Sequence, residues 1–208
     1  MIRSIAVLGL VAGGAVAAAA AAVPGDPAKV VPVAVGGPAP AFEAREVNGK
    51  PYHFTPKALK QPVLMIFYRG GWCPYCNAHL HDLKSVEPRI RALGYEVLFL
   101  STDRPELLYS SLEEKVQYHI VSDASMNAAR AMGVAYRLDA QAFKRLQDYG
   151  IDLESTQGTT NHELPVPSVF IVDRGGTVRF RYFNPDYKVR LDAASVLAAA
   201  QKALHPRG

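Results

Sequence analysis

Two segments of the chain are apolar at nearly every position, and both are typical of strands that are buried on two faces. Residues 63–68 have the sequence VLMIFY, and residues 95–100 have the sequence YEVLFL. A strand with one face in water alternates apolar and polar side chains, whereas a strand covered on both faces is apolar throughout. We therefore expect both segments in the interior of a sheet.

Helical patterns follow these strands along the chain. Residues 74–93 carry apolar side chains at helical spacing, directly after the first strand. The pattern also predicts helices at 104–115 and at about 126–132, with a short strand at 118–121. Strands that alternate with helices indicate a parallel sheet with helices on both of its faces.

Two hairpins flank this alternating centre. Asn48-Gly49, a dipeptide typical of tight hairpin turns, separates two short strand-like segments. A second hairpin turns at residues 174–176, and a helical pattern closes the chain. The expected strands are 42–47 with 52–54 and 168–173 with 177–183, and the closing helix is 192–204. Because hairpins are antiparallel, the sequence predicts an α/β fold whose central sheet is mixed.

The composition divides the chain into a leader and one domain. Residues 1–22 begin with a positive charge and continue as an uncharged, alanine-rich stretch, which predicts a secretory signal peptide; an uncleaved membrane anchor is the alternative. Residues 23–40 predict an extended leader without a packed element of its own. The domain is expected at 41–208, with an insert at about 137–165 whose polar loop is either a lid or a surface excursion.

A signal peptide implies an exported protein, periplasmic in a bacterium with two membranes, and contact with a membrane only through that segment. Lys and Arg number 23 against 19 Asp and Glu, which gives a net charge of +4 at pH 7. The basic residues are scattered and do not form a stripe with aromatic residues between them. The sequence therefore gives no support for nucleic-acid binding.

The chain has two cysteines, Cys73 and Cys76, at the junction between the strand 63–68 and the helix that follows. A disulfide across so short a loop stabilises a fold by only about 2 kcal/mol in the chain-entropy model. A chain of this size folds without cross-links, so the pair is better explained as one that opens and closes. A purely structural disulfide is the alternative.

The residues around the pair predict a reactive thiol. With Cys73 at the N-cap and Pro74 at the first helical position, the free N–H groups of the helix point toward the Cys73 sulfur. A free thiol has a pKa near 8.5, so a nucleophile at neutral pH needs a pKa lower by about one to two units. We expect the charge of Arg69 to contribute to this shift and Trp72 to pack beside the sulfur. Cys76 is expected to be the less exposed thiol, which resolves a mixed disulfide on Cys73.

Three segments carry a resemblance to a known family: GGPAPAF at residues 36–42, FYRGGWCPYC at residues 67–76, and VPSVFIVD at residues 166–173. Over roughly residues 36–204 the chain resembles the thioredoxin-fold superfamily and, within it, the peroxiredoxin-like redoxins of the alkyl hydroperoxide reductase and thiol-specific antioxidant family. The resemblance implies a thioredoxin-like fold, catalytic roles for the two cysteines, and no cofactor.

The resemblance also implies supporting residues near the cysteines. In this fold a cis proline faces the pair, and Pro167 occupies the matching position. The backbone of its neighbour Val166 would pair with an extended substrate segment. Between the cysteines, Pro74 and Tyr75 form the dipeptide that is found in glutaredoxins.

The sequence departs from both family templates. Peroxiredoxins carry Pro-x-x-x-Thr-x-x-Cys, and that spacing places Arg69, Cys73 and Cys76 at its Pro, Thr and Cys. The distant Arg that binds peroxide in that family has no clear equivalent. Many thioredoxins have an Asp six residues before the first cysteine, where this chain has Phe67.

The leading hypothesis is an exported antioxidant oxidoreductase that reduces peroxides through its Cys-x-x-Cys pair and is itself reduced by a thioredoxin-like thiol donor. The alternative substrate is a protein disulfide. With a peroxide, Cys76 is expected to attack and Cys73 to resolve; with a disulfide, the order is reversed.

Two other functional classes are less consistent with the sequence. A metal site would use Cys73, Cys76, His79 and His81, but His81 lies five positions from Cys76 on another face of the helix. The four ligands cannot converge on one ion without breaking the helix, so we expect no metal. The other class is a protein that has the same fold and binds a partner but carries out no redox reaction. The other ionisable residues form no recognisable motif and are predicted to be surface or capping residues: Asp103, Glu106, His119 and His162.

Overall fold

The structure is a computed structural model that describes residues 22–111 and 119–204. The predicted signal peptide lies almost wholly outside these ranges. Among the residues that are described, no helix has the length and apolar character needed to cross a membrane.

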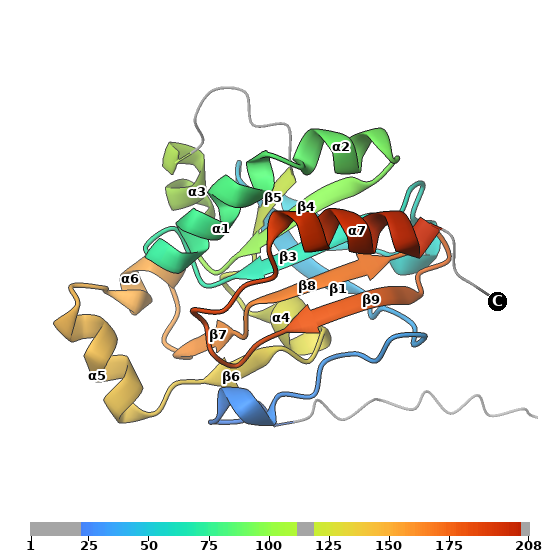
Figure 1. Cartoon of the computed structure of the whole chain (residues 1–208). Helices are drawn as coiled ribbons and strands as arrows, with labels where there is room; N and C mark the ends of the chain where they lie inside the picture. The colour runs from blue at the N-terminus through green and yellow to red at the C-terminus, as the bar shows by residue number, and fades with distance from the viewer. Residues whose placement is uncertain (1–21, 112–118, 205–208) are drawn as a thin grey trace, which may run out of the picture.

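A seven-stranded mixed sheet forms the centre of the domain, in the order β2-β1-β5-β4-β3-β8-β9 (Figure 1). Strand β3 (Val63–Tyr68) is parallel to β4 (Glu96–Ser101), which is in turn parallel to β5 (His119–Ser122). Every residue of β3 is buried. The α/β class, the mixed sheet and the interior position of both apolar strands are confirmed.

The expected hairpins form the two edges of the sheet. One comprises β1 (Phe42–Glu46) and β2 (Pro51–Phe54), and β1 joins the centre by antiparallel pairing with β5. The other comprises β8 (Ser168–Val172) and β9 (Val178–Phe183), and β8 pairs antiparallel with β3.

Helices cover both faces of the sheet (Figure 1). One apolar cluster joins the sheet to α1 (Pro74–Lys84), α2 (Glu87–Ala92) and α7 (Ala193–Leu204), and a second joins the opposite face to α4 (Asn127–Ala131). A short helix, α3 (Pro105–Ser111), follows β4; the rest of the helix expected there lies outside the described residues.

The single helix expected over residues 74–93 is wrong, because the chain breaks between α1 and α2. Pro88 stands near the start of α2 and has no N–H to donate to the carbonyl of Lys84. The break leaves α1 as a shorter helix that begins at the cysteine pair.

The insert forms a second, two-stranded sheet from β6 (Ala135–Arg137) and β7 (Glu163–Pro165), which the sequence did not predict. Two helices lie between these strands, α5 (Ala140–Asp148) and α6 (Leu153–Gln157), and α6 includes the start of the expected polar loop at residues 155–163. The fully buried carboxylate of Glu163 accepts hydrogen bonds from Arg137 at 2.9 Å and from Arg130 of α4 at 2.8 Å. The insert is therefore attached to the core by charge-assisted hydrogen bonds.

The leader packs against the domain, and the expectation that it has no element of its own is wrong. It contains a short 3-10 helix, η1 (Pro27–Lys29). Pro27 favours the start of a helix because its φ is fixed near the helical value, and the Asp26 carboxylate caps the helix by accepting a hydrogen bond from the N–H of Ala28. Gly133 has φ +72° and faces this segment so closely that a Cβ there would lie 2.2 Å from the carbonyl oxygen of Val31.

His119, at the start of β5, lies between two carboxylates and is not an isolated surface residue. Its Nδ1 is 3.0 Å from Glu96 of β4 and its Nε2 is 2.8 Å from Glu46 of β1. Despite partial burial, the hydrogen bond to Glu96, followed by that to Glu46, raises the pKa of His119 above its ordinary value of 6.5. The imidazole of His119 therefore connects three strands, β1, β4 and β5.

This cluster predicts a pH-dependent part of the stability. Because the folded-state pKa of His119 is the higher one, its stabilising contribution is fully present below about pH 6.5 and is lost as the pH rises through the folded-state pKa. We expect His119→Gln to reduce the free energy of unfolding by about 1 kcal/mol at pH 5.5 and by much less at pH 9. Urea unfolding of both proteins across this range tests the prediction, and a difference that grows with pH would contradict it.

Candidate active site

The cysteine pair lies where the sequence predicted it, at the junction of β3 and α1. Cys73 is the N-cap of α1, and Pro74 is its first residue. The carbonyl of Cys73 accepts from the backbone N–H groups of Cys76 at 3.0 Å and Asn77 at 3.1 Å. The side chain of Asn77 also donates to the carbonyl of Gly71 at 2.8 Å, so the first turn of the helix supports the loop that precedes it.

Both cysteines are free thiols, and each is only 1 % exposed. Their exposed fractions do not distinguish the two thiols, but Cys76, the one expected to be less exposed, is surrounded by more of the protein than Cys73.

The two thiols differ strongly in acidity. A hydrogen bond from the Cys76 thiol, supported by the Cys76 amide and by the charges of Arg69 and Arg190, lowers the pKa of Cys73 from 9.0 to about 6 against the effect of burial. Burial, together with the neighbouring Cys73, raises the pKa of Cys76. The surroundings therefore favour the thiolate on Cys73, with the Cys76 thiol as its hydrogen-bond donor.

Arg69 is buried beside the pair, with 5 % of its surface exposed. Its guanidinium carbon lies 4.1 Å from the ring centroid of Tyr187 and 5.0 Å from that of Trp72. Trp72 also packs against the apolar cluster that contains both cysteines, as expected. Tyr75 is 40 % exposed and meets Tyr187 edge-on at a centroid distance of 5.7 Å.

Arg190 is a site residue that the sequence analysis missed. It precedes α7 in the loop after β9, and its Nη2 lies 3.3 Å from the sulfur of Cys76, a residue 114 positions earlier. Its Nε and Nη1 are buried and have no hydrogen-bond partner in the part of the chain that the structure describes. No motif surrounds Arg190, so only the fold reveals its place.

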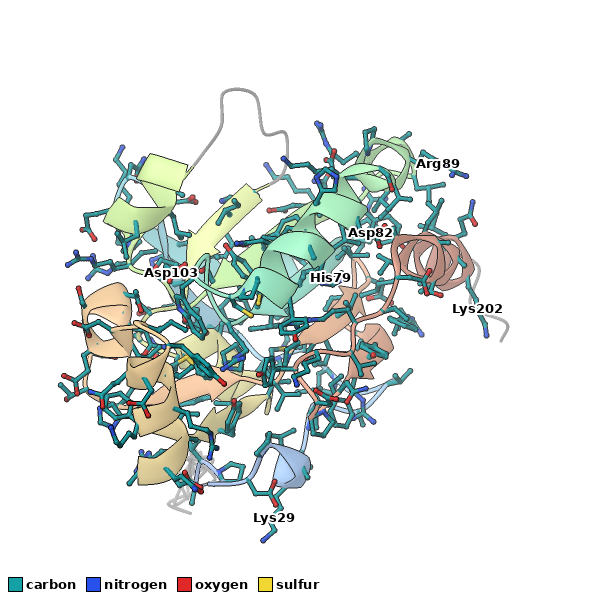
Figure 2. The ribbon with its side chains drawn as sticks, turned by 60° about the vertical axis from the view of Figure 1, so that its left-hand side comes forward. Lys29, His79, Asp82, Arg89, Asp103 and Lys202 are labelled. Carbon is teal, nitrogen blue, oxygen red and sulfur yellow. The ribbon has the colours of Figure 1, made fainter. Side chains whose placement is uncertain are left out.

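Asp103 is buried next to the active-site loop, and its predicted position at the surface is wrong. Its carboxylate accepts from the backbone N–H of Gly71 at 2.6 Å and from Ser101 at 3.1 Å, and burial raises its pKa. Figure 2 shows Asp103 beside the amino end of α1. It reaches the loop because the carboxyl ends of the parallel strands β3 and β4 are neighbours.

The segment at Val166 and Pro167 differs from the family pattern in its peptide bond and in its backbone hydrogen bonds. All peptide bonds within the described ranges are trans, so the expected cis Pro167 is wrong; trans is the preferred state of most X–Pro bonds. Val166 is fully buried, its N–H donates to the carbonyl of Val134 at 2.8 Å, and its carbonyl accepts from Ser168. The segment between α4 and β6 therefore occupies the backbone N–H that was expected to pair with a substrate.

Two polar residues of α1 attach this helix to the start of α7 (Figure 2). His79 is buried, with its Nε2 2.9 Å from the carbonyl of Leu191, and Asp82 accepts from the N–H of Ala193 at 2.8 Å. His79 is therefore a buried residue that holds α1 against the segment before α7. The described residues contain no cluster of three or more His, Cys, Asp or Glu side chains able to hold a metal ion.

A mixed sheet flanked by helices, with a Cys-x-x-Cys pair at the amino end of a helix, defines a thioredoxin-like thiol protein. The family follows from comparison with known sequences. The model described as the AhpC/TSA family matches residues 35–181, and the chain belongs to this family.

Known proteins of similar sequence and structure agree with this assignment. Peroxiredoxin Bcp of Escherichia coli K12 is 29% identical over 104 residues, which cover 50% of this chain and 66% of the relative. The peroxiredoxin-like protein from Aquifex aeolicus superposes with a TM-score of 0.62 at 18% identity, covering 83% of this chain and 89% of that protein. Peroxidoxin BcpB from Mycobacterium tuberculosis gives a TM-score of 0.57 at 18% identity, with coverages of 80% and 96%. These neighbours confirm the thioredoxin-like fold.

Proposed function

We propose that this protein is a thiol peroxidase of the peroxiredoxin type, in which Cys73 attacks the peroxide and Cys76 resolves the product. The observation that carries this proposal is the place of Cys73 at the N-cap of α1, where a hydrogen bond from Cys76 and the charges of two guanidinium groups lower its pKa to about 6. The order differs from the one that the peroxiredoxin spacing implies, because the thiolate is the nucleophile and Cys76 remains protonated.

The reaction needs no group beyond the two cysteines and an external thiol. The Cys73 thiolate attacks a peroxide oxygen, an S–O bond forms as the O–O bond breaks, and the leaving oxygen takes a proton from water. Cys76 then attacks the Cys73 sulfenic acid, giving a disulfide and releasing the hydroxyl as water with the Cys76 proton. A thioredoxin-like donor supplies two electrons and two protons to restore both thiols.

The unpartnered N–H groups of Arg190 support this chemistry. Negative charge develops on the leaving oxygen as the O–O bond breaks, and donors that are already in place stabilise such charge without reorganising. Arg190 keeps its Nε and Nη1 buried and unpaired among the described residues while its Nη2 contacts Cys76.

Peroxide consumption by the reduced protein tests the proposal. With excess thiol reductant, we expect catalytic turnover of hydrogen peroxide or an organic hydroperoxide, with a rate that rises about tenfold per pH unit below pH 6 and levels off above it. Without added thiol, the Cys76→Ser protein should react once and keep a sulfenic acid on Cys73 that dimedone traps. A sulfenic acid that forms on Cys76 in the Cys73→Ser protein would instead support the reverse order.

A protein disulfide is the second candidate substrate. Disulfide exchange requires a thiolate at the first cysteine, and Cys73 is the cysteine whose pKa is lowered. Against it, the backbone of Val166 is already bonded to Val134 and offers no edge to an extended polypeptide. If the protein reduces insulin disulfides faster than it reduces peroxide, this alternative is favoured.

We also propose that the protein is exported. The support is the charged start and the alanine-rich stretch of residues 1–22. Fractionation of cells that produce the full chain tests the location. Mass spectrometry of the amino-terminal peptide of the purified protein tests whether the signal peptide is cleaved.

A further inference from the structure

The loop between β9 and α7, residues 184–191, extends over the cysteine pair and contributes two side chains to it. Arg190 contacts the sulfur of Cys76, and Tyr187 contacts both Arg69 and Tyr75. Each thiol therefore has a guanidinium group nearby, and this one loop is in contact with both of those groups.

The guanidinium of Arg69 is enclosed by aromatic rings. It lies 4.1 Å from the Tyr187 centroid and 5.0 Å from the Trp72 centroid, and its Nε is buried without a hydrogen-bond partner among the described residues. A buried cation over an aromatic face is attracted by the ring quadrupole, more strongly than at an exposed site. Because the shorter of the two contacts is to Tyr187, this ring has the larger part in fixing the cation.

Tyr187 itself is fixed by the Cys-x-x-Cys segment. Tyr75 lies between the two cysteines and meets the Tyr187 ring edge-on, at 79° between the planes. The more distant Lys188 is 6.0 Å from the same ring. The result is a continuous stack from Tyr75 through Tyr187 and Arg69 to Trp72, which runs beside the sulfurs.

We propose that Tyr187 is a positioning residue that holds the Arg69 guanidinium beside Cys73 through a cation–π contact. Tyr187 acts through Arg69 and touches neither sulfur in this role. The inference rests on the proposed function only in that Cys73 is the working nucleophile, and its test does not require peroxidase activity.

The groups that act on the charge of Cys73 are known from the structure. They are Cys76 on α1, Arg69 before the helix and Arg190 in the loop, and Tyr136 of β6 is close enough to respond to Cys73, Arg69 and Tyr187. A change at Tyr187 that frees Arg69 leaves the Cys76 hydrogen bond in place. It should therefore shift the acidity of Cys73 without restoring that of an ordinary thiol.

The experiment measures the pH dependence of Cys73 alkylation by iodoacetamide, with the modified residue identified by mass spectrometry. We expect Tyr187→Leu to raise the midpoint by about half a unit to one unit, and Tyr187→Phe, which keeps the aromatic face, to leave it unchanged. Tyr149→Leu is the matched control, because Tyr149 is 77% exposed. Its midpoint should equal that of the wild type.

A double-mutant cycle separates this role from a general loosening of the loop. Arg69→Gln should raise the midpoint, and Tyr187→Leu should add nothing further in that background. If Tyr187→Leu raises it as much without Arg69 as with it, or if Tyr187→Phe behaves like Tyr187→Leu, the proposal is wrong. Thermal unfolding followed by circular dichroism establishes that each variant is folded, and a folded Tyr187→Leu protein with an unchanged midpoint also overturns it.

Discussion

The Cys73→Ser protein is expected to consume peroxide no faster than the uncatalysed reaction. Cys73 is the thiolate of the pair, with a pKa of about 6, and Ser cannot supply an ionised nucleophile at neutral pH. Initial rates with hydrogen peroxide and excess thiol measure the effect. Because Cys73 is buried and Ser is close to it in size, the variant should unfold at nearly the same temperature as the wild type.

The Cys76→Ser protein is the matched control for this experiment. It keeps the attacking sulfur, so without added thiol it should consume one equivalent of peroxide and then stop, because no second cysteine remains to form the disulfide. Full catalytic turnover by the Cys73→Ser protein would contradict the assigned order, as would the absence of any reaction from the Cys76→Ser protein.

The Gly70→Ala protein is expected to lose both activity and about 3 kcal/mol of stability. Gly70 has φ +137°, and a Cβ there would lie 2.4 Å from Nε1 of Trp72 and 2.8 Å from Oδ1 of Asp103. Backbone strain and overpacking each cost about 1 to 3 kcal/mol, and the Cβ would meet the indole and the carboxylate at once. Urea unfolding and peroxide turnover measure the two effects.

Gly71→Ala provides a control one residue away. A Cβ at Gly71 would be 3.5 Å from Oδ2 of Asp103, which is an ordinary contact, and Gly71 has no positive φ. We expect it to change stability by less than about 1 kcal/mol. Equal losses in the two variants would mean that the loop tolerates no side chain at either position and that the close approach at Gly70 is not the cause.

The parts of the fold that the sequence predicted well depend on local pattern. The continuous apolar runs predict the buried strands β3 and β4 without reference to the segments that pack on them. The proline directly after Cys73 predicts the start of α1 in the same way. The break before α2 was also accessible, since a proline inside a helical pattern ends or kinks the helix.

What the sequence could not predict depends on contacts between distant segments. Arg190 and Tyr187 reach the cysteines only because the turn after β9 returns to the amino end of α1. The pairing of β6 with β7 involves strands of three residues, too short to show an alternating pattern, and it is this sheet that brings Val134 to Val166. The contact of Asp103 with the active-site loop, by contrast, could have been predicted from the sequence. Asp103 follows β4 and the loop follows β3, and residues that follow adjacent parallel strands are expected to meet.

The contacts of the leader bear on the order in which the chain folds. Gly36 and Gly37 exchange backbone hydrogen bonds with Val178 of β9, and Ala39 bonds to Gly176, so the first and last parts of the domain are joined directly. Closing so long a loop is slow compared with local pairing. The native packing of the leader therefore cannot be completed until β9 has been synthesised, so the first residues of the domain are among the last to reach their final contacts.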